Sequence, residues 1–214
     1  GMLDSEQHCP GQEWPFQPGP RTVKFHVELP PAGVGVNTGL TLVLHNWGGR
    51  YDEAHYLEWA QVFAARYNVV AISVNYLQSG GGEPTVNGEI PYDFSYLQAM
   101  DCLRALHQVW SQLKGSGTVF NDRRSYAMGG SGGGHVTQMI NKFAPYTFAC
   151  SMDICGMTVL NDNAAFGLGP YGSIMNAGYS RDPASPAFPT RDMQEIRDAG
   201  FPGHLAIQFK ANPG

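Results

Sequence analysis

The chain has 214 residues, of which 43% are hydrophobic and 12% are aromatic. This is enough for one ordinary globular domain with a hydrophobic core, and the composition excludes a disordered chain. The net charge of −5 and the single adjacent basic pair, Arg123-Arg124, argue against nucleic-acid and anionic-membrane partners, and the continuous apolar stretches are too short to span a bilayer.

The four cysteines match no zinc-binding template. Cys150 and Cys155 fall in or beside one apolar, strand-like run, so we expect buried free thiols and a reducing cytoplasm. No pair of carboxylates and no His/Cys cluster has metal-like spacing. The sequence therefore implies no metal and no other cofactor.

Residues 1–20 are rich in Pro, Gly and Gln and are predicted to be irregular. Apolar residues then alternate with polar ones over 23–29, which predicts a half-exposed strand. The continuous apolar runs at 40–46 and 68–76 predict strands that are buried on both faces, as in a parallel sheet. Between them, residues 52–67 carry a one-sided apolar stripe that is typical of an amphipathic helix.

The second half of the chain continues this alternation, with predicted helices at 93–113 and 133–143 and predicted strands at 124–129 and 148–157. Such an order favours one α/β domain over 1–214, with a doubly wound, mostly parallel sheet and right-handed crossovers. Residues 158–190 are rich in Gly, Asn and Pro and are expected to form a lid or a disordered loop over the carboxyl ends of the strands. A helix is expected to follow at about 190–199.

Six small residues in a row, Gly129 to Gly134, surround one hydroxyl group, that of Ser131. A sharp strand-to-helix turn can present one reactive side chain, provided that the residues two before and two after it lack bulk; here these are Gly129 and Gly133. A phosphate-binding loop would need Lys, and a dinucleotide fingerprint would need Gly, where His135 stands. A flexible linker does not fit between a buried strand and an amphipathic helix. The pattern therefore predicts a nucleophilic serine.

A second motif, "HNWGG" at 45–49, follows a predicted buried strand. An oxyanion hole needs two converging backbone N–H groups, one from the residue after the nucleophile, Gly132, and one from a loop after an earlier strand. The glycines of this loop would let its backbone approach a substrate closely.

Residues 22–157, with "HNWGG" and "GGSGGG", resemble the N-terminal two-thirds of an α/β-hydrolase, and in particular uncharacterised bacterial hydrolases related to the esterase and prolyl-oligopeptidase branches. The resemblance implies that Ser131 is the nucleophile and that the amides of Gly132 and Trp47 form the oxyanion hole. Asn46 stands where the family usually has Gly.

In this family an acid and then a histidine follow the nucleophile, on loops after later strands. His204 is the one histidine after the predicted nucleophile helix, and 204–211 has the apolar alternation of a strand that would precede the acid loop, or is a helix there. The family's last strands are also missing. Three explanations remain open: the sequence represents part of a longer protein, the triad is improvised, or the fold is inactive.

Asp153, near the end of the last clear strand, is a candidate acid, although a hydrogen bond at a strand end also explains it. His135 lies one helical turn after Ser131 and is a candidate base, with packing or pocket lining as the alternative. We also assign His45, Asn46, Arg50 and Tyr76 to the substrate pocket, with His45 shaping the oxyanion loop and with ordinary packing as the alternative for Arg50 and Tyr76.

The sequence thus predicts a serine hydrolase that cleaves a small or medium carboxylic ester through an acyl-enzyme on Ser131. The alternatives are a peptidase related to prolyl oligopeptidases, which would act on short peptides, and a catalytically inactive binding protein with the same fold.

Overall fold

The computed structural model describes residues 3–14, 16, 18–80, 91–157, 162–172 and 176–185. The predicted helix at 190–199, the segment 204–211 and His204 lie outside these residues. Within the described part of the chain, no helix is both long enough and apolar enough to traverse a lipid bilayer.

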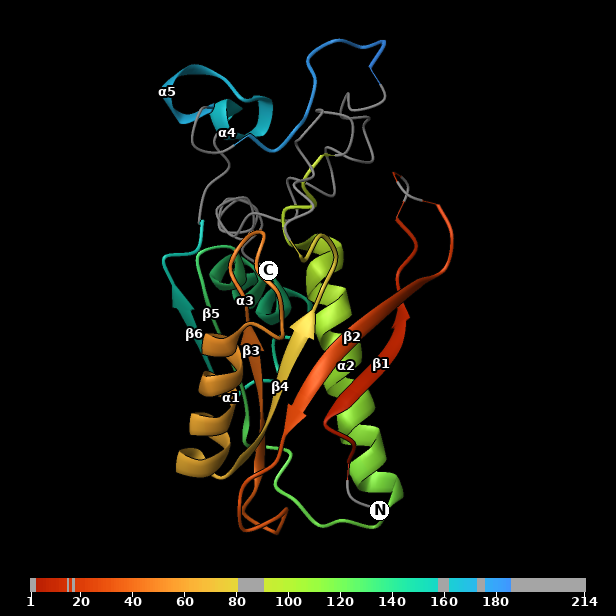
Figure 1. Cartoon of the computed structure of the whole chain (residues 1–214), viewed down its shortest axis with the longest axis vertical. Coiled ribbons are helices and arrows are strands. Elements are labelled where there is room, and N and C mark those ends of the chain that lie inside the picture. The colour runs from red at the N-terminus through yellow and green to blue at the C-terminus, as the bar shows by residue number, and fades with distance from the viewer. Residues whose placement is uncertain are drawn as a thin grey trace, which may run out of the picture.

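Within the described residues, a six-stranded, mostly parallel sheet forms the centre of the fold, in the order β1-β2-β4-β3-β5-β6 (Figure 1). Four strands, β3 to β6, run parallel to one another, and β2 is antiparallel to both β1 and β4. The bounds of the strands are β1 Glu6–Gly11, β2 Arg21–Glu28, β3 Gly39–Leu44, β4 Val69–Asn75, β5 Ser125–Gly130 and β6 Cys150–Ile154.

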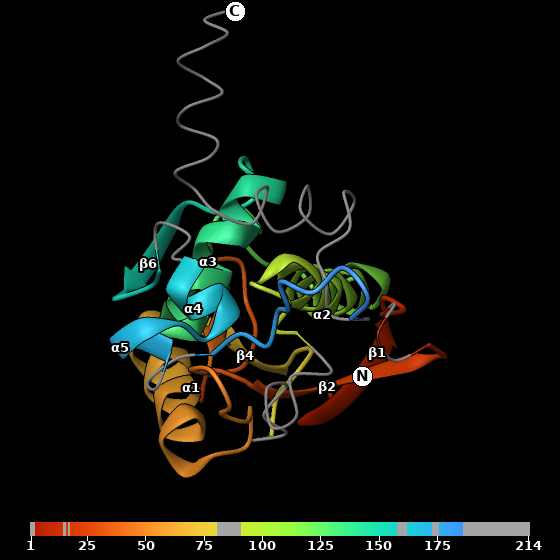
Figure 2. The ribbon, with the colours of Figure 1, turned by 90° about the horizontal axis from the view of Figure 1, so that it is seen from above.

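Helices cover the two faces of the sheet, as the crossover rule requires. Helix α1 (Ala54–Tyr67) lies on one face, and α2 (Tyr96–Gly115) and α3 (Gly132–Phe143) lie on the other, as the view from above in Figure 2 shows. The larger apolar core lies between the sheet and α2 and α3, and a smaller one lies under α1. Strands β3 and β4 are buried along almost their whole length, as their continuous apolar sequences predict.

Two short helices, α4 (Asp162–Phe166) and α5 (Gly169–Gly172), lie above the carboxyl ends of the parallel strands (Figure 1). They belong to the segment that the sequence assigns to a lid or loop. Backbone hydrogen bonds fix part of it: Ala177 N donates to Ala164 O at 2.8 Å, and Tyr92 N donates to Ala177 O at 2.7 Å. The described part of this segment is thereby joined to the chain just before α2.

Two predictions about the edges of the sheet were wrong. Residues 1–20 are not irregular throughout, because Glu6–Gly11 pairs with β2 as strand β1. Cys150 and Cys155 are exposed rather than buried, whereas the free thiols of Cys9 and Cys102 are buried. The reason is that β6 is the outermost strand of the described sheet, so an apolar sequence does not ensure burial there.

Candidate active site

Ser131 stands at the junction of β5 and α3 with a strained backbone, φ 53° and ψ −117°. A non-glycine residue adopts a positive φ at a cost on the order of 1–3 kcal/mol, so the surrounding structure must hold it there. The residue is exposed at the carboxyl end of the sheet. A reactive side chain in this position is accessible to a substrate.

The glycines that flank Ser131 are required by close backbone contacts. A Cβ atom on Gly129 would collide with the carbonyl of Gly133, and one on Gly133 would lie 2.5 Å from the carbonyl oxygen of His45. Both distances are shorter than real Cβ contacts allow. The structure therefore gives the two outer glycines of Gly-x-Ser-x-Gly the steric role that the sequence motif predicts.

Backbone hydrogen bonds hold the turn. Ser131 N donates to Ile154 O on β6 at 2.8 Å, and Ser131 O accepts from His135 N at 3.1 Å in the first turn of α3. Within the described residues, Ser131 Oγ has no hydrogen-bond partner. The hydroxyl therefore stands clear beside the positive end of α3, where negative charge is favoured.

The loop after β3 meets this turn at Gly132. A Cβ atom on Gly132 would lie 2.6 Å from Trp47 N, so the backbones of the two residues are in close contact. Gly48, the next residue of the loop, has φ +74°, a conformation that glycine adopts without strain. The structure thus brings Ser131, Gly132 and Trp47 together at the carboxyl ends of β3 and β5.

His45 lies buried beneath this loop. Its Nδ1 atom is 2.8 Å from Asn46 O, its Nε2 atom is 2.6 Å from Ser79 Oγ, and its ring stacks on Tyr76 at 4.0 Å. Burial lowers the pKa of His45 to about 4, so the ring is neutral at pH 7. His45 supports the loop from below rather than facing an open pocket.

Two tyrosines complete this support. Tyr56 OH on α1 accepts a hydrogen bond from Asn46 N at 2.8 Å and donates one to Asn46 Oδ1 at 2.7 Å. Tyr76 OH donates to His45 O, and burial raises the pKa of Tyr76 well above its usual range. Tyr76 and the Asn46 side chain thus hold the loop through hydrogen bonds.

The side chains of the remaining predicted residues contact groups other than the Ser131 hydroxyl. Arg50 is exposed and pairs with Asp52 at 2.5 Å, which raises the pKa of Arg50. His135 is buried in α3, with Nδ1 3.2 Å from Ser95 Oγ. Asp153 accepts from Gly156 N at 2.7 Å and from Gln138 Nε2, which are hydrogen bonds at the end of β6.

An aromatic cluster that the sequence did not predict lies between the loop at 45–49 and the segment 162–185. Trp47 stacks on Tyr92 with ring centroids 4.6 Å apart, and Phe94 stacks on Tyr179 at 5.9 Å. Phe166 of α4 packs against the same cluster. Because these residues come from distant parts of the chain, periodicity in the sequence carries no signal of their contact.

Buried polar groups at the start of α2 hold the chain that follows β4. Asp101 pairs with Arg21 at 2.6 Å and accepts from Leu77 N at 2.9 Å. Asp93 accepts from Gln98 N at 3.0 Å, and burial raises the pKa of Asp93 to about 7. The segment after β4 is therefore fixed to α2 by buried hydrogen bonds, which are strong in a medium of low dielectric constant.

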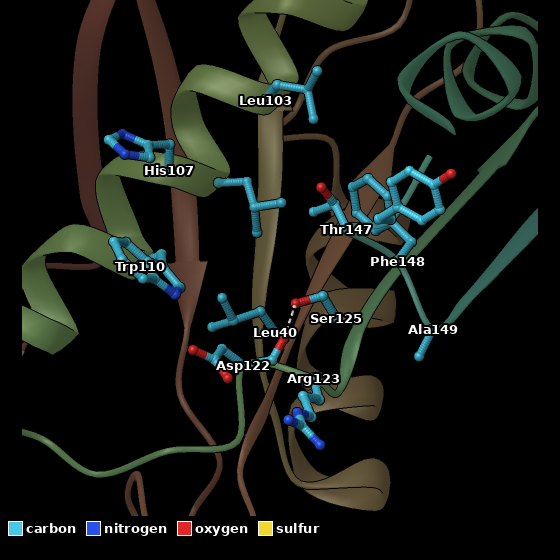
Figure 3. A pocket seen from close by; sticks show the side chains of 12 residues that line it. Leu40, Leu103, His107, Trp110, Asp122, Arg123, Ser125, Thr147, Phe148 and Ala149 are labelled. Carbon is cyan, nitrogen blue, oxygen red and sulfur yellow. Dashed lines mark hydrogen bonds between the residues drawn. The ribbon is translucent and has the colours of Figure 1, made fainter. Parts of the chain in front are cut away.

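A separate groove of about 590 Å³ lies near the amino ends of the parallel strands, at the end of the sheet opposite to Ser131 (Figure 3). Its floor includes Leu40 and Ser125, near the amino ends of β3 and β5, and Trp110 of α2 and Phe148 line its sides. Ser125 Oγ donates to Asp122 O at 2.8 Å. Since Ser131 follows the carboxyl end of β5, this groove does not belong to the site around Ser131.

No group of three or more His, Cys, Asp or Glu side chains within the described residues could hold a metal ion. Around Ser131, the described residues supply a hydroxyl group, backbone amides and a helix terminus.

No protein-family model matches the sequence, and a search of curated proteins found no match. Among solved structures, the chain is similar to the rice cell wall degrading esterase LipA from Xanthomonas oryzae, with 17% identity and a TM-score of 0.53, over 76% of this chain and 44% of that one. A ligand-bound form of LipA gives a TM-score of 0.51 at 17% identity, over 71% and 41%.

Est1E from Butyrivibrio proteoclasticus gives a TM-score of 0.49 at 13% identity, over 69% of this chain and 52% of that one. The chain thus spans between 41% and 52% of the length of these structures. With its mostly parallel six-stranded sheet, helices on both faces and likeness to LipA, the chain has the fold of the α/β-hydrolase superfamily that its sequence motifs predict.

Proposed function

We propose that the chain is a serine hydrolase that cleaves a small or medium carboxylic ester. One observation carries the proposal: Ser131 has φ 53° at an exposed strand-to-helix turn, in backbone contact with the Trp47 loop through Gly132. Strain of this kind persists where a reactive group must be presented. The name of LipA, an esterase with the same fold, supports the same reaction class.

In the proposed mechanism, Ser131 Oγ attacks the carbonyl carbon of the ester while its proton passes to a base. The carbonyl oxygen gains negative charge and is held by the amides of Gly132 and Trp47, next to the N-terminus of α3. The bond to the alcohol then breaks, the alcohol leaves with the proton, and water releases the acid from Ser131 by the same route.

We assign the base to a histidine outside the described residues, because the His135 ring is buried against Ser95. The lid segment would cover the acyl or alcohol group through the aromatic cluster that includes Trp47 and Tyr92. The proposed partner is thus a small-molecule ester. The four free cysteines support a cytoplasmic setting.

A fluorophosphonate probe tests the proposal on the full-length protein, since it labels an activated serine covalently. We expect one label for each chain and its complete loss in Ser131→Ala. Ser111→Ala, which removes a hydroxyl from the surface of α2, is the matched control and should label as the wild type does. Absence of labelling in the folded wild type would contradict the proposal and favour the inactive binding protein.

The same preparation separates esterase from peptidase. We expect hydrolysis of short p-nitrophenyl esters to exceed that of proline-containing anilides by at least about tenfold in kcat/KM, because an ester needs less help with its leaving group. A preference for the anilides would favour the peptidase related to prolyl oligopeptidases.

A further inference from the structure

The peptide group between Asn46 and Trp47 is held by its oxygen. Asn46 O accepts hydrogen bonds from Gly49 N at 3.0 Å and from His45 Nδ1 at 2.8 Å. In a planar trans peptide the C=O and N–H bonds point in opposite directions, so fixing this oxygen also fixes where the Trp47 N–H points. The orientation of the amide that we assign to the oxyanion hole therefore depends on the His45 ring.

The His45 ring can act in this way in one tautomer. Because a carbonyl oxygen accepts and never donates, Nδ1 must carry the proton that reaches Asn46 O. In a neutral ring Nε2 is then an acceptor and needs a donor. Within the described residues that donor is Ser79, whose Oγ lies 2.6 Å from Nε2.

The Ser79 hydroxyl has one proton and two neighbours. Its Oγ atom is also in hydrogen-bond contact with Tyr76 O at 2.6 Å, an acceptor that competes with His45 Nε2 for the same proton. Tyr76 O already accepts a hydrogen bond from Ser79 N at 3.1 Å, whereas Nε2 has the hydroxyl as its donor. If the hydroxyl proton is donated to His45 Nε2, both buried acceptors have a donor: Nε2 has Ser79 Oγ, and Tyr76 O keeps Ser79 N.

Ser79 is itself held on both sides. Leu77 N donates to Asp101 Oδ2 at 2.9 Å, and Leu77 O accepts from Gln98 Nε2 at 3.1 Å, both on α2. On the other side, Gly80 N donates to Gly49 O at 2.9 Å, which ties the segment to the oxyanion loop. The hydroxyl is thus presented to His45 from a fixed backbone.

We propose that Ser79 is a positioning residue for the reaction at Ser131: it donates to His45 Nε2, selects the Nδ1–H tautomer, and so orients the Asn46–Trp47 peptide. The proposal rests on the proposed function, because it concerns the oxyanion hole of that reaction. It assigns a role to a side chain that touches neither Ser131 nor the substrate.

Kinetics of p-nitrophenyl acetate hydrolysis by the full-length protein provide the first test. We expect Ser79→Ala to lower kcat by about tenfold to a hundredfold, because a misplaced oxyanion donor weakens binding of the transition state, while KM changes by less than about threefold. Ser79→Thr keeps the hydroxyl and should recover most of kcat. In a His45→Asn background, Ser79→Ala should have almost no further effect, since the acceptor is gone.

Ser73→Ala is the matched control. Ser73 Oγ donates to Tyr51 O at 2.9 Å from a buried position on β4, so this variant also loses a hydroxyl hydrogen bond but leaves His45 untouched. Its kcat should stay within about twofold of the wild type. A Ser79→Ala enzyme that behaves as Ser73→Ala does, or a Ser79→Ala effect that persists unchanged in the His45→Asn background, would overturn the proposal.

The tautomer itself provides a readout that needs no activity. Imidazole ¹⁵N NMR spectra should show His45 as the Nδ1–H tautomer in the wild type and as a mixture of tautomers in Ser79→Ala. An unchanged tautomer would refute the role of Ser79 whatever the kinetics. If the wild type fails to label at Ser131 or to hydrolyse esters, the proposed function fails, and the spectra still decide whether Ser79 controls His45.

Discussion

The two halves of the candidate site are held in different ways. The turn at Ser131 is fixed by backbone packing, because Gly129 and Gly133 leave no room for a side chain. The loop at 45–49 is fixed by the side chains of His45, Tyr56 and Tyr76, each through a hydrogen bond. Adding an atom to the turn should therefore disrupt its backbone packing, whereas removing a polar atom beneath the loop should disrupt the hydrogen bonds that hold the loop.

The largest expected effect comes from adding one methyl group to the turn. In Gly133→Ala the new Cβ atom would lie 2.5 Å from His45 O and would collide with Leu44 O, both backbone atoms that cannot move without shifting β3 and the loop at 45–49. We expect a loss of about 3 kcal/mol or more in the free energy of unfolding, measured by urea denaturation.

Gly130→Ala is the control for this change, because it adds the same group in the same motif. The nearest atom to its Cβ, apart from those of its chain neighbours, is Ile154 O at 3.9 Å. The free energy of unfolding should stay within about 1 kcal/mol of the wild-type value. Equal losses in the two variants would mean that packing does not distinguish the glycines of the turn.

The loop should reveal its dependence on His45 through pH. Burial lowers the pKa of His45 from 6.5 to about 4, so between these values the unfolded chain binds a proton that the folded chain does not. Stability must then fall as the pH drops from 6.5 toward 4, by on the order of 3 kcal/mol in all. His45→Asn keeps a donor for Asn46 O but cannot ionise, so it should lack this loss.

The measurement is the difference between the wild type and His45→Asn in the free energy of unfolding, followed from pH 4 to pH 7. The difference isolates His45 because other groups are common to both proteins. Asp93, whose pKa burial raises to about 7, is one of these, and it contributes with the opposite sign, losing stability as the pH rises. A difference that does not vary with pH would contradict the buried, neutral His45.

The turn could be predicted from sequence because its steric requirements lie within five consecutive residues. Gly-x-Ser-x-Gly between an apolar strand and an amphipathic helix specifies both the bend and the exposed hydroxyl. The loop at 45–49 could be placed after β3 for the same reason. The residues that support this loop could not be predicted. Tyr56 and Ser79 lie 10 and 34 residues along the chain from their partners Asn46 and His45, and the contact of Ser79 with His45 depends on the register of β3 against β4.

The same limit explains the errors at the edges of the sheet. The six residues of β1, Glu6–Gly11, include Pro10 and lack the apolar alternation of a half-buried strand, so the pairing with β2 alone makes them a strand. For β6 the apolar sequence was informative about strand formation but not about position in the sheet. Strand order is a property of the whole chain, and a local pattern does not carry it.

The smallest expected effect comes from removing one oxygen atom beneath the loop. Tyr76→Phe keeps the ring that stacks on His45 but leaves His45 O without the phenolic donor. A buried carbonyl that loses its partner should lower the free energy of unfolding by about 1–2 kcal/mol. Tyr67→Phe on α1, where the side chain is exposed, should cost less than about 0.5 kcal/mol in the same assay.

The two tyrosine variants also distinguish support of the loop from general stability. If the phenol orients the loop, Tyr76→Phe should slow fluorophosphonate labelling of Ser131 several-fold under conditions in which the protein is fully folded. A rate equal to that of Tyr67→Phe would mean that the loop keeps its shape without this hydrogen bond. In that case His45, Tyr56 and the backbone contact with Gly132 would be sufficient to hold it, and the loop would resemble the turn in depending mainly on packing.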